Sequence, residues 1–299
     1  MRAMNVTILS LHSYPVKSCA GIAHTHANIG VAGLALDRQW VVVDGNGRFM
    51  TQRTCARLAL IQPGLEAERL TLSAPGMPPV HVAKPEHGSA TPGIPIPVPV
   101  RIFCSDTLGA DEGDAVAHWL SAFLETPCRL LRLHPNAARM ASPQHVDAWR
   151  AAHQDWAPGF PAQHSFGFAD GFPFLVTNQA SLDELNEQMR VKGEPPIPMN
   201  RFRPNIVLDG LQAYEEDMLT GLRIGSMRFA LVKPCARCPV PNIDQDTAIA
   251  AREPGLTLAE TRRFSAGVLF GVNAVVDGAG TGAGSGAQLS VGERVETNP

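Results

Sequence analysis

Hydrophobic and polar residues alternate over short stretches along most of this 299-residue chain, and 27 glycines and 25 prolines interrupt the pattern. Alternation bounded by turn-forming residues is typical of short β-strands. The predicted strands cover residues 6–11, 39–44, 57–61, 70–73, 205–208, 227–232, 272–276 and 289–291. A hairpin is expected around residues 33–38 and a turn at 45–47. We therefore expect a mixed α+β structure that is mainly β.

Two segments have helical spacing instead. Residues 112–125 carry one apolar stripe, formed by Val116, Trp119, Leu120, Phe123 and Leu124. Residues 181–191 repeat this spacing, and Ser181 with Glu184 matches the capping box that begins many helices. Residues 134–165 between them are rich in His, Ala, Pro and Gln, which predicts an irregular connection.

Two further segments are dominated by proline or glycine. Residues 92–100 put Ile and Val on one face and Pro on the other, which predicts an edge strand or an extended loop because Pro cannot donate to a neighbouring strand. Residues 278–287 are rich in glycine and lie between two strand patterns. A glycine-rich phosphate cradle must begin a helix, so we expect a flexible hairpin loop here.

Composition and charge exclude several protein classes. The 25 basic and 28 acidic residues give a net charge of −3, and 44% of residues are hydrophobic, which argues against disorder. No stretch approaches the ~20 apolar residues of a membrane-spanning helix. The chain has no basic block and only two Tyr and four Trp for base stacking, which argues against a nucleic-acid binder.

Cysteine usage indicates a reducing compartment. Six cysteines include one close pair and do not make a disulfide scaffold. The first residues lack the apolar core and cleavage site of a secretory signal. We therefore expect a cytoplasmic protein.

The close pair, in Lys233-Pro-Cys-Ala-Arg-Cys-Pro-Val-Pro241, follows a predicted strand. A zinc site would need a second pair of ligands nearby. A redox dithiol would need a helix start, which the prolines after Cys238 oppose. One thiolate could instead bind a soft metal, with Arg237 lowering the cysteine pKa. Two buried structural cysteines are the fourth interpretation.

Three other segments carry groups that suit an anion. Asn200-Arg-Phe-Arg-Pro-Asn205 places several donors before a strand. Tyr14-Pro-Val-Lys-Ser18 places an ammonium and a hydroxyl at a strand end. Arg38 lies beside Asp37. Each of these segments alone is equally consistent with a solvated surface loop.

Taken in order, the segments resemble the family of MOSC-domain proteins that carry an N-terminal β-barrel domain. Within it they are most similar to the mitochondrial amidoxime-reducing component and its bacterial relatives. The resemblance covers about residues 6–296. It rests on Tyr14-Pro-Val-Lys-Ser-Cys-Ala-Gly21, Gly33-(x)3-Asp-Arg-Gln-Trp40, Arg203-Pro-Asn205, Cys235-Ala-Arg-Cys238 with Asp244-x-Asp-Thr247, and Leu269-Phe-Gly-Val-Asn273.

The resemblance implies a molybdenum–molybdopterin cofactor. Cys238 would be the metal ligand and the catalytic residue, and Cys235 would be structural or would lie next to the metal ligand without binding the metal. The cofactor-binding positions implied are Lys17, Ser18, Arg38, Asp170, Arg203, Asn205, Arg237 and Asn273. It also implies a small β-barrel domain over about residues 1–110 and a MOSC β-barrel domain with connecting helices over 111–299, with the cofactor between them.

The implied activity is reduction of small N-hydroxylated compounds, amidoximes and hydroxylamines, to amines. Some relatives carry an iron–sulfur domain with four cysteines that this chain lacks, so we expect a separate electron-donor protein with a flavin or an iron–sulfur cluster. Some relatives also have a Trp soon after the Glu-Asp pair, where this chain has Met218. Asp209, Glu216 and Asp217 are candidate proton donors, with solvated loop carboxylates as the alternative.

The same residues suit two other functions. A carrier that stores or delivers the molybdenum cofactor would need the same anchoring groups. A sulfur carrier would hold a persulfide on Cys238, as the MOSC domains attached to sulfurases suggest, and these sulfurases are associated with pyridoxal phosphate.

Overall fold

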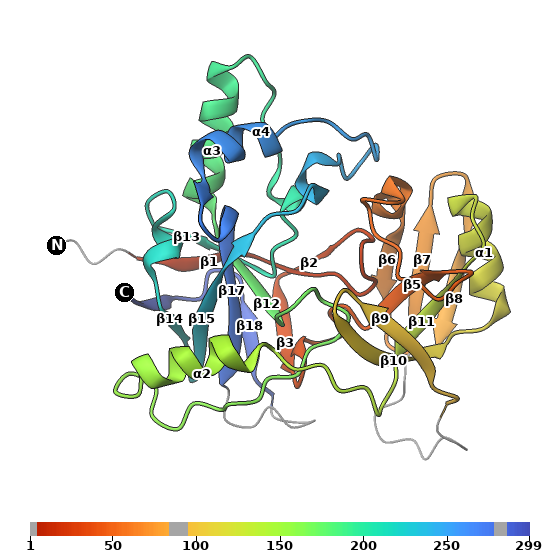
Figure 1. The fold of residues 1–299 in the computed structure, drawn as a ribbon, viewed down its shortest axis with the longest axis horizontal. Coiled ribbons are helices and arrows are strands. Elements are labelled where there is room, and N and C mark those ends of the chain that lie inside the picture. Colours follow the sequence, from red (N-terminus) through yellow and green to blue (C-terminus); the bar gives the residue numbers. More distant parts are fainter. Residues whose placement is uncertain (1–4, 84–94, 278–285) are drawn as a thin grey trace.

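The computed structural model describes residues 5–83, 95–277 and 286–299, which form two lobes (Figure 1). The larger lobe is built on a nine-stranded sheet. Its strands run in the order β19 (Val295–Asn298), β14 (Gly221–Ile224), β15 (Met227–Ala236), β17 (Gly267–Asp277), β12 (Phe174–Asn178), β13 (Ile206–Asp209), β1 (Thr7–Ser13) and β2 (Ile22–His24), and β16 (Arg263–Phe264) pairs with β17. Only the β12–β13 pair is parallel among these described strands.

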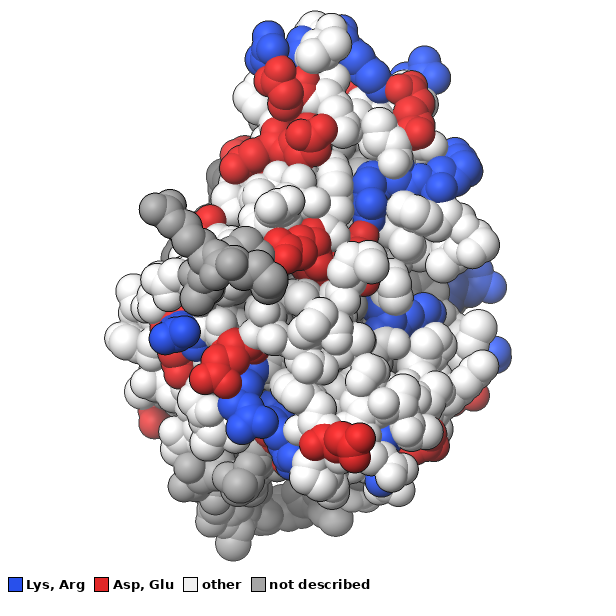
Figure 2. Space-filling view, turned by 90° about the vertical axis from the view of Figure 1, so that its left-hand side faces the viewer, with Lys and Arg blue, Asp and Glu red and all other residues white. Residues whose placement is uncertain are grey.

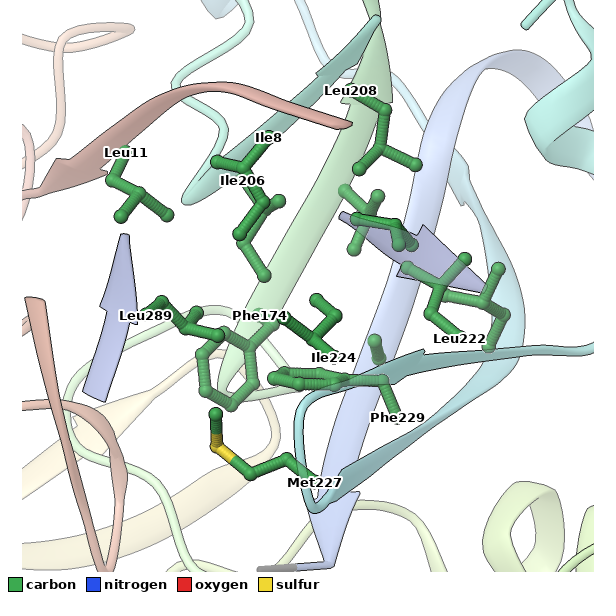
Figure 3. Packing of buried hydrophobic residues seen from close by; sticks show 14 of the residues in the cluster. Ile8, Leu11, Phe174, Ile206, Leu208, Leu222, Ile224, Met227, Phe229 and Leu289 are labelled. Atoms are coloured by element: carbon green, nitrogen blue, oxygen red, sulfur yellow. The ribbon is translucent and has the colours of Figure 1, made fainter. Parts of the chain in front are cut away.

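The large sheet closes on itself. The backbone N–H of Val295 donates to Val6 O (2.8 Å) and that of Ile8 to Glu293 O (3.0 Å), which joins the C-terminal end of the chain to β1. Alternate side chains therefore fill the interior of a barrel. Figure 3 shows this core, where the Phe174 and Phe229 rings lie edge to face with centroids 5.3 Å apart. A small sheet, β18 (Gln288–Ser290), β3 (His26–Gly30) and β4 (Gly33–Leu34), lies beside it.

In the described part of the chain, the smaller lobe contains two antiparallel sheets and one α-helix. The four-stranded sheet has the order β5 (Trp40–Asp44), β11 (Cys128–Leu133), β10 (Ser105–Asp111) and β9 (Val98–Ile102). The three-stranded sheet has the order β6 (Gln62–Leu65), β7 (Arg69–Ala74) and β8 (Met77–Ala83). Helix α1 (Asp114–Leu124) covers the core between them, and the strands form a half-barrel.

The sequence of β5 shows why it is central. Trp40 and Val42 point into the core under α1, whereas Val41 and Val43 point into a second cluster that contains Phe168 of the larger lobe. A strand buried on both faces needs a continuous apolar run rather than an alternating one. This strand therefore fixes one lobe against the other.

Three local predictions are wrong. Residues 57–61 are not a strand, because the 3₁₀ helix η1 (Ala56–Leu60) occupies them, and short apolar runs do not distinguish the two. Residues 134–165 are not wholly irregular, since helix α2 (Pro143–Ala152) buries Val146 and Trp149. The capping box is also wrong: helix α3 (Gln179–Val191) is capped by the Asn178 side chain, and Ser181 lies within it.

The other predicted elements are confirmed within a few residues, including α1, α3 and the edge position of β9. Residues 92–94 and 278–285 lie outside the described residues, so the structure does not test the Pro-rich segment fully or the predicted glycine loop. The described helices include one more, α4 (Gly255–Thr261), and the mixed α+β class dominated by strands is confirmed.

The lobes do not divide the chain at one point. Strands β1, β2 and β3, from the first 30 residues, belong to the larger lobe with the C-terminal strands. Strand β11 and helix α1, which follow residue 110, belong to the smaller lobe. The chain therefore crosses between the lobes several times.

The surface has no single-sign patch on the face drawn in Figure 2, where acidic and basic side chains are interspersed. No helix among the described residues is long and apolar enough to cross a bilayer.

Candidate functional site

A cavity lies between the two lobes. Its volume is about 140 Å³, and it opens to solvent. Residues from both lobes line it. All nine positions expected to bind the metal or the cofactor are among them: Lys17, Ser18, Arg38, Asp170, Arg203, Asn205, Arg237, Cys238 and Asn273.

Lys17 enters the cavity from a tight turn after β1. Its backbone N–H donates to Trp40 O (2.8 Å), and the next residue, Ser18, has a φ of 68°. The buried Lys17 ammonium donates to Phe168 O (2.8 Å) and to the Asp170 carboxylate. Burial lowers the pKa of Lys17, and the Asp170 charge opposes this shift. The site thus holds a cation that protein oxygens satisfy only in part.

Asp170 lies at the cavity wall with 69% of its side chain exposed. Neighbouring protein atoms disfavour its charged form, but the Lys17 ammonium outweighs them and lowers the pKa of Asp170 to about 2. Asp170 is therefore ionised at neutral pH and acts as the counter-ion of Lys17.

Arg38 and Arg203 both rest on the ring of Tyr14. Their guanidinium carbons lie 4.3 and 4.2 Å from the ring centroid, at cation–π distance. Arg38 also donates to Asp37 Oδ2 (2.6 Å), and Asp37 Oδ1 accepts the Tyr14 N–H (2.7 Å). Burial lowers the pKa of Arg203 to about 10. One aromatic ring therefore positions two cavity cations.

Gly21 makes room for that ring. A Cβ at this position would lie 2.5 Å from Tyr14 Cε1, closer than real carbon contacts. Both residues belong to the segment Tyr14 to Gly21 singled out in the sequence, but their contact was not predicted. Nothing in the sequence pattern indicates that the Tyr14 ring supports both Arg38 and Arg203.

Asn205 braces Arg38. Its Oδ1 accepts from Arg38 Nη1 (3.1 Å) and from the Leu175 N–H (3.1 Å), and its Nδ2 donates to His12 O (3.2 Å). The side chain is buried and these bonds occupy both ends of its amide. Asn205 therefore holds β1, β12 and Arg38 together at the cavity wall.

The cysteine pair lies where β15 ends. The strand includes Cys235, and Cys238 follows it, before the 3₁₀ helix η4 (Val240–Asn242). Arg237 Nη1 donates to Cys235 Sγ (3.1 Å), and its Nη2 donates to Phe202 O (2.9 Å). Cys238 Sγ has no hydrogen-bond partner among the described residues and lines the cavity. The arginine thus contacts the first sulfur, and the second is free to take a ligand.

Two further groups complete the wall. Asn273, on β17, donates from Nδ2 to Lys233 O (3.3 Å), which ties it to β15. The Nε of Arg237 is buried without a partner within the described part of the chain. A buried donor left unpaired costs about 1–3 kcal/mol, so a ligand that accepts from it would be stabilised.

The charge of the cavity suits an anion. Five basic side chains line it, Lys17, Arg38, Arg53, Arg203 and Arg237, against the single carboxylate of Asp170. A pterin with a phosphate group and sulfur ligands carries negative charge, and a thiolate suits a soft metal. The residues present therefore fit a molybdenum–pterin cofactor.

The candidate proton donors lie elsewhere. Neither Asp209, Glu216 nor Asp217 lines the cavity. Glu216 is fully buried, where it accepts from Ser181 Oγ (2.7 Å), and Asp217 pairs with Arg262. The alternative of solvated loop carboxylates also fails for this pair, because both are held in the protein interior.

The structure also bears on the other cysteine interpretations. All six cysteines are free thiols. Across residues 5–83, 95–277 and 286–299, no group of three or more His, Cys, Asp or Glu side chains could hold a metal ion.

Comparison with known proteins identifies both halves of the chain. The MOSC N-terminal beta barrel domain model matches residues 5–127, and the MOSC domain model matches residues 163–296. A solution structure of a Bordetella bronchiseptica protein covers 37% of this chain at 24% identity, with a TM-score of 0.30 that is too low to support an argument.

Curated relatives match over most of the chain. Human mitochondrial amidoxime-reducing component 1 is 31% identical over 289 residues, which are 92% of this chain and 80% of that protein. Bovine mitochondrial amidoxime reducing component 2 is 30% identical over 263 residues, 72% of its length. Human molybdenum cofactor sulfurase is 31% identical over 267 residues, but this chain spans only 28% of it. The chain belongs to the family of proteins that join a MOSC N-terminal β-barrel domain to a MOSC domain.

Proposed function

We propose that this protein is a molybdenum-cofactor-dependent oxidoreductase that reduces N-hydroxylated compounds, with electrons from a separate donor protein. The observation that carries the proposal is the cavity between the lobes, where the free Cys238 sulfur and five cations meet from both ends of the sequence. The names of the relatives, amidoxime-reducing components, supply the substrate class.

The cofactor, when bound, supplies the two-electron redox chemistry. Cys238 would hold its metal as a thiolate, and Lys17, Ser18, Arg38, Arg203 and Arg237 would bind its pterin and phosphate groups, with Asp170, Asn205 and Asn273 supporting them. On this proposal the N-terminal domain, about residues 1–110, provides Lys17, Ser18 and Arg38, and residues 111–299 provide the other residues.

The chain's own residues prepare the cavity for this chemistry. Four of the five cations, all but Arg53, are already held by protein oxygens or by Tyr14, so they need little reorganisation when an anion arrives. Phe172, Phe174 and Phe202 line part of the wall and exclude water. The overall change consumes two electrons and two protons, converts an N–OH group to N–H, and releases water. Asp170 stays ionised and keeps the proton on Lys17 Nζ.

The test is to purify the protein from a molybdate-replete host, measure molybdenum, and assay benzamidoxime reduction with an artificial electron donor. Molybdenum with turnover is the expected result. Molybdenum without turnover would favour a cofactor carrier. Absence of molybdenum, together with cyanide-labile sulfur on Cys238, would favour sulfur transfer.

A further inference from the structure

A second cavity in the smaller lobe shares a wall with the first. Thr51, Arg53 and Phe103 line both. The second cavity is formed by the turn after β5 and by β9 with the start of β10, and its volume is about 670 Å³. It is therefore large enough for part of a small molecule whose other end lies in the first cavity.

An aromatic pair lies at the shared wall: Phe103 lines both cavities, and Phe49 lines the second. Phe49 and Phe103 lie edge to face with centroids 5.0 Å apart, and Lys17 Nζ lies 5.7 and 5.6 Å from the two rings. Phe103 is 41% exposed and has a φ of 52°, a conformation that bulky residues rarely adopt. An exposed ring held in this way offers a flat apolar surface beside the cavity that contains Cys238.

The rest of the second cavity is basic. Arg48, Arg53 and Arg101 line it, with Asp106 as the one acid. Arg101 and Asp106 are 3.7 Å apart and strongly exposed, so their pairing is weak. Neither Arg48 nor Arg53 has a carboxylate partner in the part of the chain that the structure describes. The Arg53 guanidinium lies over the Phe103 ring, 5.2 Å from its centroid. Arg48, without a carboxylate partner among the described residues, and Arg101, with only a weak ion pair, are thus the two guanidinium groups available to a ligand.

We propose that this second cavity binds the far end of the substrate and selects amphiphilic molecules, with an aryl ring on Phe49 and Phe103 and a carboxylate on the arginines. Aromatic rings stack edge to face or offset, and guanidinium groups bind carboxylates with two parallel hydrogen bonds. The inference rests on the proposed function and names a substrate class within it: N-hydroxylated aryl compounds with an anionic group.

Binding of unreactive analogues tests the inference without requiring catalytic turnover. Isothermal titration calorimetry would compare 4-carbamoylbenzoate with neutral benzamide, which are unreactive analogues with and without the carboxylate. We expect the anion to bind about tenfold more tightly at low salt, and the preference to shrink as NaCl is raised. The double variant Arg48→Gln/Arg101→Gln changes only the second cavity and should lose the preference. Arg69→Gln, an exposed position on β7 outside both cavities, should keep it.

Kinetics separate this inference from the proposed function. With 4-carboxybenzamidoxime, the ratio of its kcat/KM to that of benzamidoxime should be about ten and fall in the double variant. Equal affinity of the two probes in the unmodified protein overturns the inference, and so does a preference that survives in the double variant, because the anion then binds elsewhere. If 4-carbamoylbenzoate binds more tightly than benzamide as expected but benzamidoxime is not reduced, the anion site is confirmed and the proposed reductase function is wrong.

Discussion

At the scale of single residues, Tyr14 has the widest effect on the site. Two of the five cavity cations rest on its ring, and its backbone N–H holds Asp37, which in turn holds Arg38. An uncharged side chain thus positions charges that come from residues 38 and 203. A cofactor site of this kind depends on the support behind the charged groups as much as on the groups themselves.

The two cysteines should differ when replaced. Cys238→Ala should abolish molybdenum retention and activity, because this sulfur lines the cavity without another partner. Cys235→Ala should keep at least part of both, because its sulfur already contacts Arg237. Elemental analysis of molybdenum per protein and a benzamidoxime assay measure the difference. Cys104→Ala, at an exposed position, is the matched control. Equal loss in both variants of the pair would show that the cysteines act together.

Nine site residues could be predicted because the order of several short motifs resembles a known family, and the structure brings all nine to one cavity. The contacts that support these residues could not be predicted from the sequence. The role of Gly21 depends on where the Tyr14 ring lies, and that of Asn205 depends on three segments far apart in the chain. Neither spacing nor residue type carries this information.

At the scale of elements, long periodic segments were predictable and short or mixed ones were not. Helix α1 has five apolar residues on one face and appears where expected. Helix α2 buries only Val146 and Trp149 among ten residues, so its pattern is too sparse to stand out. Helix α3 begins earlier than expected because Asn178, at the end of β12, caps it.

The 3₁₀ helix η3 (Glu215–Met218) contains a carboxyl that opposes stability at neutral pH. Burial raises the pKa of Glu216 from 4.5 to about 7, the hydrogen bond from Ser181 works against this shift, and Asp217 adds to it. The folded protein therefore binds this proton where the unfolded chain has released it. The contribution of Glu216 to the free energy of unfolding is complete below about pH 4.5. It falls by about 3 kcal/mol as the pH rises to about 7.

Replacing Glu216 by Gln removes this loss of folding stability at neutral pH, because the Gln side chain carries no titratable proton. The Glu216→Gln variant should be more stable than the unmodified protein at pH 8 and lose the advantage near pH 5, as measured by urea unfolding at both values. Glu194→Gln, at an exposed position, should change stability equally at both. A stability difference for Glu216→Gln that does not depend on pH would contradict the raised pKa.

At the scale of the whole molecule, two buried glutamines join the lobes. Gln52 lies in the loop after β5, and Gln245 follows η4. Each amide donates to the other's oxygen, at 2.8 and 3.0 Å, and Gln52 also donates to Ser18 O (2.8 Å). The pair therefore connects the Lys17–Ser18 turn with the loop beyond Cys238.

This connection should appear as coupling in a double-mutant cycle. Gln52→Leu and Gln245→Leu should each cost about 1–3 kcal/mol, because each leaves the oxygen of the other buried amide without its hydrogen-bond donor. The double variant should cost at least about 1 kcal/mol less than the sum. Urea unfolding measures all three, and Gln154→Leu, at an exposed position on the larger lobe, should change stability by less than about 0.5 kcal/mol. Additive costs would mean that the two amides act independently.

The pairing of β1 with β13 has a consequence for newly made chains. His12 and Asn205, which bond across this pair, are 193 positions apart. At about 5–20 residues per second, a ribosome takes roughly 10 to 40 s to add the residues between them. Throughout this time Ile8 and Leu11 have no barrel interior to enter. Strand β1 thus leaves the ribosome long before β13 and cannot complete its folding until β13 follows, so nascent chains expose its apolar side chains during this interval.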